Sequence, residues 1–274
     1  MKVIKHSGHI VDFDSEKLKQ SLLKSGAGPS VVDEVMGDLE IYDGITTKKI
    51  YKQAFALLKK TSFSNAARYN LRTALQMLGP AGFFFEKFIA RIYSSEAYET
   101  TNNLILKGKC VSHEIDVALS KDNNVTIIEC KFHNNRESNC DVKVPLYVLS
   151  RFNDLKENQH SIFSENDNIS RCIIVTNNRF TSDATAFANC AGLLLLSWNY
   201  PDKDCIRTKI DKNSLYPVTC LTTLSITEKE KLMILDIILV RELINNSACL
   251  QKIRISENRI KNVLKEASEL CNYL

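Results

Sequence analysis

Three short runs of apolar residues, separated by stretches of helical character, constrain the fold of this chain most strongly. The runs are "VTII" from residue 125, "RCIIVT" from residue 171 and "LLLLSW" from residue 193. Runs of about four to eight apolar residues between helical patterns are typical of buried strands in a sheet that helices cover on both faces. The middle of the chain is therefore expected to form a mixed β-sheet flanked by helices.

The sequence on either side of this core has a different character, and the pattern predicts three regions in an α/β protein. Residues 1–78 are expected to form an α+β domain, in which two short strands form a small β cap on a helical bundle. Residues 81–205 hold the mixed sheet, and Gly79-Pro80 separates the two. Residues 206–274 read as a linker and a small all-α region.

Composition narrows the class of protein. The chain has 274 residues, is 44% hydrophobic and carries a net charge of +4, without a polybasic tail. It contains no apolar run of the roughly 18 to 20 residues that a membrane helix needs, so no membrane partner is expected. Nine cysteines without a Cys-x-x-Cys pair indicate reduced thiols, which favours a cytoplasmic protein without structural zinc.

Charged residues at the end of an apolar strand indicate a chemical site. In "VTIIECKF", Glu129 and Lys131 lie two residues apart and share one face of the strand. The preceding strand, "HEIDVAL", brings Asp116 beside Glu129 if the two strands pair through the turn "KDNN". Two carboxylates and a backbone carbonyl provide the oxygen ligands that Mg²⁺ or Mn²⁺ prefers. Glu114 and His133 lie near the same face and are expected at most to bind substrate.

The order of these elements resembles the PD-(D/E)xK nucleases, in particular the Mrr-like restriction endonucleases. Glu86 in "GFFFEKFIARIY" matches the helix glutamate of that family, and "RCIIVTNNRFTSDATAFANCAGLLLLSW" is similar to its closing strand–helix–strand. The resemblance implies that Asp116 and Glu129 bind the metal, that Lys131 serves the water or the phosphate, and that Glu86 completes the catalytic set. It also implies a metal-dependent endonuclease acting on nucleic acid, chiefly double-stranded DNA, in restriction or phage defence.

Other interpretations stay open at this point. Glu129 and Lys131 alone also fit an ion pair at a strand end, which contributes little to stability. RNA or branched DNA would suit the same chemistry. A nucleotide-sensing, nucleic-acid-binding protein with an inert nuclease core is a third alternative, which the intact set of Asp116, Glu129 and Lys131 disfavours.

The first region resembles the ATP-cone, an allosteric nucleotide-binding module. Its matching segments are "VIKHSGHIVDFDSEKL" and "AARYNL", with His6 where the family usually has arginine. The resemblance implies that ATP or dATP binds here as an effector and changes access to the site or the oligomeric state of a homo-oligomer. A small domain with merely solvated lysines is the alternative. The residues expected at the nucleotide are Val3, Lys5, His6, Gly8, Lys17 and Thr47, with Tyr51 against the base.

The last region, "SACLQKIRISENRIKNVLKEASEL", faintly resembles a helix-hairpin-helix DNA-binding unit. Its turn "KIRIS" lacks the glycine that such hairpins usually carry. A packing or dimerisation domain is an equal alternative, and no internal repeat is detected in the sequence.

Overall fold

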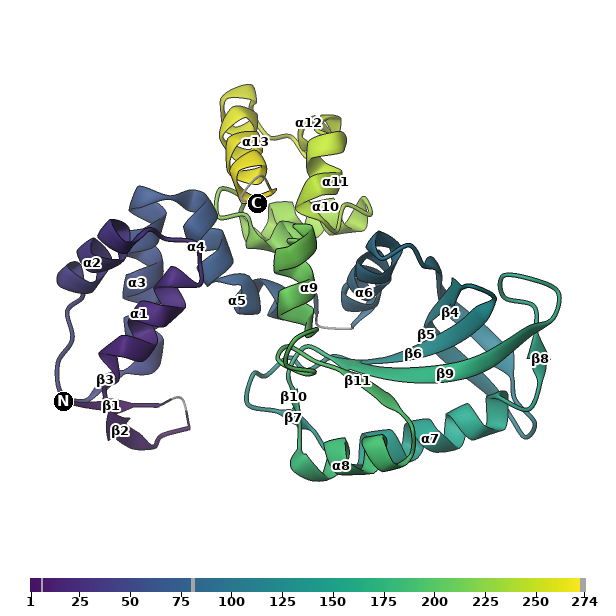
Figure 1. Ribbon diagram of the computed structural model, residues 1–274. Helices are drawn as coiled ribbons and strands as arrows, with labels where there is room; N and C mark the ends of the chain where they lie inside the picture. Colours follow the sequence, from purple (N-terminus) through teal and green to yellow (C-terminus); the bar gives the residue numbers. More distant parts are fainter. Residues whose placement is uncertain (6, 80–81, 272–274) are drawn as a thin grey trace. The chain divides into compact units, whose positions relative to one another are not determined.

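The computed structural model describes residues 1–5, 7–79 and 82–271, which belong to two compact units (Figure 1). One unit combines Met1–Ala74 with Tyr216–Leu274, and the other is Leu75–Leu215. The expectation of an α/β protein with a central mixed sheet is confirmed in the second unit. No helix among the described residues is both long and apolar enough to span a bilayer.

The main sheet of the second unit runs in the order β11-β9-β6-β5-β4, with β8 paired to β9. The strands β4, β5 and β6 form an antiparallel meander, whereas β6, β9 and β11 run parallel. A separate parallel pair joins β7 and β10. The strand bounds are β4 (Glu99–Lys107), β5 (Ser112–Lys121), β6 (Asn124–Lys131), β7 (Asn139–Cys140), β8 (Gln159–His160), β9 (Asp167–Thr176), β10 (Arg179–Phe180) and β11 (Leu194–Leu196).

Helices cover both faces of this sheet, with α6 on one side and α7 and α8 on the other (Figure 1). Val148 and Leu155 of α7 pack with Ile127 and Ile174 of the sheet in one apolar core. Because both faces are covered, the second half of β5 is buried on both sides, and the alternation of buried and more exposed residues along the strand stops after Val117. The helices are α6 (Phe83–Ser95), α7 (Lys143–Leu155), α8 (Ser182–Cys190) and α9 (Ile206–Asn213).

The turn between β5 and β6 sets the register of the candidate site. Asp122 and Asn123 both have positive φ, of 50° and 60°, as a two-residue hairpin of the primed type requires. The ladder pairs Lys121 with Asn124 and continues to Val117 opposite Ile128. The hairpin expected through "KDNN" is therefore confirmed, and the next two residues are Asp116 and Glu129.

The first unit begins with a three-stranded sheet in the order β2-β1-β3, against which helices pack. Gly8, at φ 83°, allows the turn between β1 and β2. The helical stretch from Phe63 to Gln76 is interrupted at Asn70, which caps its first part. The elements are β1 (Lys2–Ile4), β2 (Ile10–Asp12), α1 (Ser15–Leu23), α2 (Pro29–Asp38), β3 (Ile45–Thr46), α3 (Thr47–Thr61), α4 (Phe63–Tyr69) and α5 (Leu71–Gln76).

The C-terminal helices pack against this N-terminal segment within the same unit. The Arg68 guanidinium of α4 donates to the carbonyl of Leu270 at 2.8 Å. The Glu266 carboxylate, 1% exposed, accepts hydrogen bonds from the backbone of Thr222 and from Thr223. The elements of this part are a 3₁₀ helix (Val218–Cys220), α10 (Ile226–Ile234), α11 (Val240–Asn245), α12 (Ala248–Lys252) and α13 (Glu257–Cys271).

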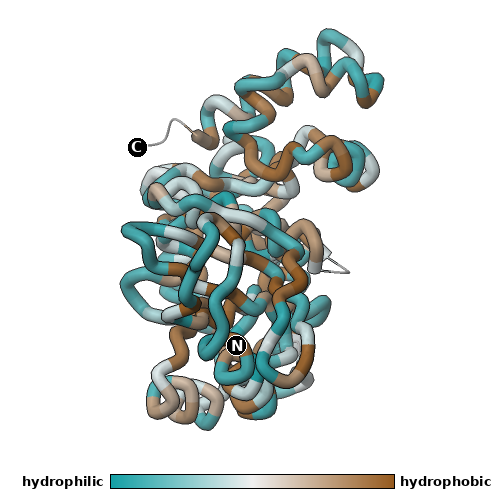
Figure 2. Tube along the Cα trace, turned by 90° about the vertical axis from the view of Figure 1, so that its right-hand side faces the viewer, coloured by the Kyte–Doolittle hydropathy of each residue, from teal (hydrophilic) through white to brown (hydrophobic). Residues whose placement is uncertain are grey.

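A repeat that the sequence does not reveal lies in these helices. The turns after α10 and α12 place a left-handed residue at the same point, Asp236 at φ 61° and Arg254 at φ 65°. Three backbone hydrogen bonds, including Ile237 N–H to Leu232 and Ile255 N–H to Leu250, recur eighteen positions apart. Hydrophobic and hydrophilic residues alternate along these helices (Figure 2).

Candidate functional site

Glu86 enters the site from the first turn of α6. The helix starts after Gly82, whose φ of 87° is left-handed and unfavourable for residues with a side chain. Phe85 and Phe88, on the buried side of the helix, are fully enclosed and fix its position on the sheet. The Glu86 side chain is half-buried and is close enough to Asp116 and Glu129 for their charges to influence it.

Asp116 lies where the ladder between β5 and β6 ends. Its carboxylate accepts a hydrogen bond from the backbone N–H of Cys130 at 2.6 Å. This bond replaces the strand pairing that would otherwise continue, and it points the carboxylate toward the segment that carries Glu129 and Lys131. The expected convergence of Asp116 with Glu129 therefore occurs through strand pairing and this side-chain bond.

Glu129 is held by Arg151, which comes from α7. The guanidinium Nη1 lies 2.5 Å from Oε2 of Glu129, and the two side chains are 12% and 21% exposed. The second terminal nitrogen, Nη2, donates to the carbonyl of Glu114 on β5. Arg151 thus links β5, β6 and α7 at the carboxylates.

The negative charges of these carboxylates repel one another. Burial, followed by the charges of Asp116, Glu114 and Glu129, raises the pKa of Glu86 to about 7. Burial and the charge of Asp116 raise the pKa of Glu129 to about 7, although Arg151 and Lys131 act in the opposite direction. Burial also raises the pKa of Asp116, against the hydrogen bond from Cys130. Perturbed carboxylates in one cluster are typical of functional sites.

The remaining residues expected at the site take different places. Lys131 is exposed at the end of β6, and its positive charge lowers the pKa values of both Asp116 and Glu129. The backbone of His133 exchanges two hydrogen bonds with the Asn177 side chain, and burial lowers the pKa of its imidazole. The backbone of His133 is therefore fixed by Asn177, which directly follows β9.

The cluster fits a divalent cation by its donor types. Glu86, Asp116 and Glu129 supply oxygen atoms, and a cation among them would relieve the repulsion that raises their pKa values. Among the described residues, no three acidic, histidine or cysteine side chains form a ready metal-binding group. A metal here would be held by the two carboxylates of Asp116 and Glu129 with backbone carbonyl and water oxygen atoms.

Arg151 is the residue that the sequence analysis missed, although a signal was present. It follows Val148 by three positions and precedes Leu155 by four, and both of these residues are buried. Residues at these spacings share one face of a helix. An arginine on the apolar face of an amphipathic helix requires an anionic partner, because burying an unpaired charge is costly.

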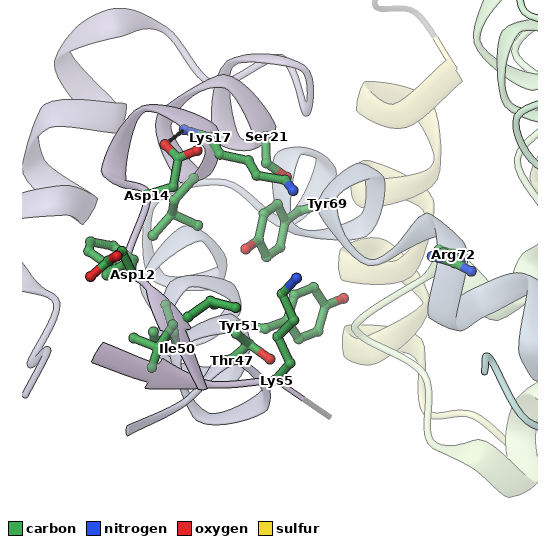
Figure 3. Close-up of a pocket in the computed structure, with 14 residues that line it drawn as sticks. Lys5, Asp12, Asp14, Lys17, Ser21, Thr47, Ile50, Tyr51, Tyr69 and Arg72 are labelled. Atoms are coloured by element: carbon green, nitrogen blue, oxygen red, sulfur yellow. Dashed lines mark hydrogen bonds between the residues drawn. The ribbon is translucent and has the colours of Figure 1, made fainter. Parts of the chain in front are cut away.

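A second candidate site is a pocket of about 670 Å³ in the first unit. Five of the seven residues expected at a nucleotide line it, namely Val3, Lys5, Lys17, Thr47 and Tyr51. Figure 3 shows Lys5 and Lys17 extending toward Tyr51 and Tyr69. The two tyrosine rings are stacked with centroids 4.9 Å apart, so the aromatic wall is larger than the single ring expected.

The other expected nucleotide residues are not part of this wall. Gly8 lies in the turn beyond β1 and does not line the pocket, and His6 lies outside the described residues. The two lining aspartates have partners in the chain, because Asp12 pairs with Lys2 at 2.9 Å and Asp14 caps α1. Their charges therefore oppose an anionic ligand less than unpaired carboxylates would.

The sheet, the helix glutamate and the carboxylate pair with its lysine define a restriction-endonuclease-like domain. A family model described as "Restriction endonuclease" matches residues 80–199, and one described as "AF1548-like, C-terminal" matches residues 216–271. An uncharacterized protein of Archaeoglobus fulgidus is 30% identical over 186 residues, which are 66% of this chain and 99% of that protein. The chain belongs to the AF1548-like family of this archaeal relative.

Solved structures add to the comparison. The crystal structure of AF1548, a protein of unknown function, aligns with a TM-score of 0.58 and 29% identity, covering 69% of this chain and 98% of that one. The MspJI restriction endonuclease in complex with an oligonucleotide aligns with a TM-score of 0.32 and 12% identity, covering 48% of this chain and 29% of that one. The similarity to AF1548 supports the fold described here over 69% of the chain.

Proposed function

We propose that this chain is a divalent-metal-dependent endonuclease that hydrolyses phosphodiester bonds of DNA and is regulated by ATP or dATP. The observation that carries the proposal is the convergence of Glu86, Asp116 and Glu129 beside Lys131, in the order of elements that the Mrr-like nucleases share. Double-stranded DNA is the first substrate to test. A setting in restriction or phage defence accords with the match to restriction endonucleases.

The residues divide the work of hydrolysis as follows. Asp116 and Glu129 would hold Mg²⁺ or Mn²⁺, which when bound polarises the phosphate and lowers the pKa of a water molecule. Lys131, exposed at the strand end, would orient that water or stabilise negative charge on the phosphate. Glu86 would bind the metal through a water molecule or hold the geometry of the site from its position on α6.

Plasmid cleavage in Mg²⁺ or Mn²⁺ tests the activity. Wild type should cut, and Lys131→Ala should lower the rate by about 100-fold or more. Lys107→Ala, another exposed lysine at a strand end of the same sheet, is the matched control and should cut normally. Absence of cutting of both plasmid and single-stranded DNA by wild type with either metal, with or without nucleotide, would overturn the proposal for DNA.

Metal binding has its own readout in thermal unfolding. Mg²⁺ or Mn²⁺ should raise the Tm of wild type, since a ligand that binds only the folded state stabilises it. The rise should vanish in Asp116→Asn and persist in Asp202→Asn, an exposed aspartate of the same unit. An equal rise in both variants would exclude Asp116 as a ligand.

The nucleotide part of the proposal rests on the pocket of the first unit. Its volume of about 670 Å³ is within the range of small-molecule sites. The stacked tyrosines offer a wall for a base, while Lys5 and Lys17 offer charges for phosphates. The nucleotide would act on access to the nuclease site or on the assembly of a homo-oligomer.

Calorimetric titration with ATP and dATP tests this pocket. Lys17→Ala and Lys5→Ala should each weaken binding by about tenfold, because each removes one cation that faces phosphate. Lys24→Ala, at the exposed end of the same helix as Lys17, should leave affinity unchanged. Equal affinity in all three variants would place the nucleotide elsewhere or remove it from the proposal.

A further inference from the structure

A row of side chains along α7 leads from the exposed start of the helix to the carboxylates. Lys143, Tyr147 and Arg151 follow one another at intervals of four residues, so they lie along one side of the helix. Lys143 is exposed at the start of the helix, and Arg151 ends at Glu129. Four residues advance the helix by about 6 Å, so Tyr147 lies about one helical turn from Arg151, which contacts Glu129.

Tyr147 is a large aromatic residue that does not pack into the core of this fold. The residue is 59% exposed, while its neighbour Val148 is buried in the core. The Arg151 guanidinium lies over the Tyr147 ring, 5.4 Å from its centroid. Because Arg151 is itself fixed by Glu129 and Glu114, it braces the ring from one side, while more than half of the residue stays open to solvent.

We infer that Tyr147 is a stacking platform for an unpaired nucleobase next to the phosphate that is cut. The inference rests on the proposed nuclease function and names its substrate class, which is a strand with at least one unpaired nucleotide at the cleavage position. An aromatic face flanked by cations is the combination that binds single-stranded nucleic acid, because every base has a π-face and every linkage carries a charge. Bases inside an intact duplex are stacked on each other and cannot use such a ring.

The row then assigns one contact to each side chain. Lys143 meets a backbone phosphate, Tyr147 stacks on the base, and Arg151 positions Glu129 for the neighbouring phosphate. Leu146 precedes Tyr147 on the same turn and is 46% exposed. It is off the row and serves as the matched control for the loss of an exposed apolar side chain.

The first experiment measures binding without cleavage. A short single-stranded oligonucleotide that contains 2-aminopurine is titrated with the full chain in the presence of EDTA. Stacking quenches the probe, so wild type, Tyr147→Phe and Leu146→Ala should quench it, and Tyr147→Ala should bind about tenfold or more weakly with little quenching. Equal quenching by Tyr147→Ala and wild type would overturn the proposal, whether or not the protein is a nuclease.

The second experiment compares substrates. Duplex, single-stranded and flapped DNA of the same sequence are cut with Mg²⁺ or Mn²⁺ by wild type and the variants. Wild type should prefer the single-stranded or flapped substrate, and Tyr147→Ala should raise KM for it with a smaller effect on duplex. Equal KM values for Tyr147→Ala and wild type, with cleavage intact, would reject the platform and leave the nuclease proposal standing. Failure of Lys131-dependent cleavage with every substrate would reject the nuclease proposal alone.

Discussion

Arg151 and Glu129 form a largely buried ion pair whose contribution to stability depends on pH. At pH above about 7 the Glu129 carboxylate is ionised and needs its partner, whereas below that value it gains a proton. Arg151→Gln should therefore lower the free energy of unfolding by about 2–4 kcal/mol at pH 8 and by clearly less at pH 5.5. Urea unfolding at the two pH values measures this difference.

A surface ion pair provides the comparison for that prediction. On α9, Nε of Arg207 lies 3.7 Å from Oδ2 of Asp211, four residues further along the helix, and both side chains are partly exposed. Arg207→Gln should change stability by less than about 1 kcal/mol at either pH. A loss in Arg151→Gln that is the same at pH 5.5 and pH 8 would contradict the raised pKa of Glu129.

Glu86 predicts the sign of a second pH effect. Its pKa rises from 4.5 to about 7 on folding, so the folded chain binds this proton more tightly than the unfolded chain does. Without metal, the free energy of unfolding should fall as pH rises from about 4.5 to about 7. Glu86→Gln should flatten this fall by about 1–2 kcal/mol, a range reduced for partial exposure. Thermal unfolding in EDTA across this pH range provides the measurement, and a curve for Glu86→Gln parallel to wild type would refute it.

The site residues show what a sequence can indicate at this scale. Glu129 and Lys131 are recognisable because charge at the end of an apolar strand is unusual, and Asp116 follows from strand pairing through a short turn. Arg151 lies twenty-two residues from Glu129, and only its place between Val148 and Leu155 on the helix indicates a buried partner. The pattern shows that a partner is needed but not which carboxylate supplies it.

Strands and helices of the second unit follow from local sequence more closely than those of the first. Apolar runs predict β6, β9 and β11 well because strands buried on both faces appear in the sequence as continuous apolar runs, without alternating polar residues. The interruption of the helix at Asn70 is harder to predict, because a cap in the middle of a helical pattern depends on tertiary packing. The burial of β5 on both faces is hard to predict for a similar reason, since it results from α6 packing against the strand.

One buried carboxylate holds the C-terminal helix to the segment before α10. Glu266 accepts two backbone hydrogen bonds and one from the Thr223 hydroxyl. Glu266→Ala should lower the free energy of unfolding by about 2–4 kcal/mol, because it leaves these buried donors unpaired. Glu257→Ala, at the exposed start of the same helix, should cost less than about 1 kcal/mol. Urea unfolding distinguishes them, and equal losses would mean that Glu266 does not anchor this segment.

At the scale of the whole molecule, the chain leaves the first unit after residue 74 and returns to it at residue 216. The sequence predicts the three successive regions but not that the first and last pack together, because contacts between residues 163 to 202 positions apart leave no local pattern. Arg68 and Leu270 are one such pair, as are Lys59 and the carbonyl of Thr222.

Deletion of residues 216–274 should therefore affect the start of the chain and spare the middle. Hydrogen exchange of α4 should accelerate, since Ala66, Ala67 and Arg68 lose the helix that covers them. Amides of β6 and β9 should keep their protection. Uniform loss of protection in both units would show that they unfold as one cooperative body, and unchanged exchange in α4 would show that α13 does not stabilise it.

The turns at Asp236 and Arg254 allow one backbone conformation to be tested twice in the same protein. The same backbone geometry appears twice in one chain with different side chains, aspartate in one copy and arginine in the other. A glycine placed at each position in turn relieves the same left-handed conformation in both. The change in the free energy of unfolding that both substitutions share then reports on the turn itself, and the difference between the two changes reports on the aspartate and arginine side chains. A motif that occurs once in a protein does not allow this separation.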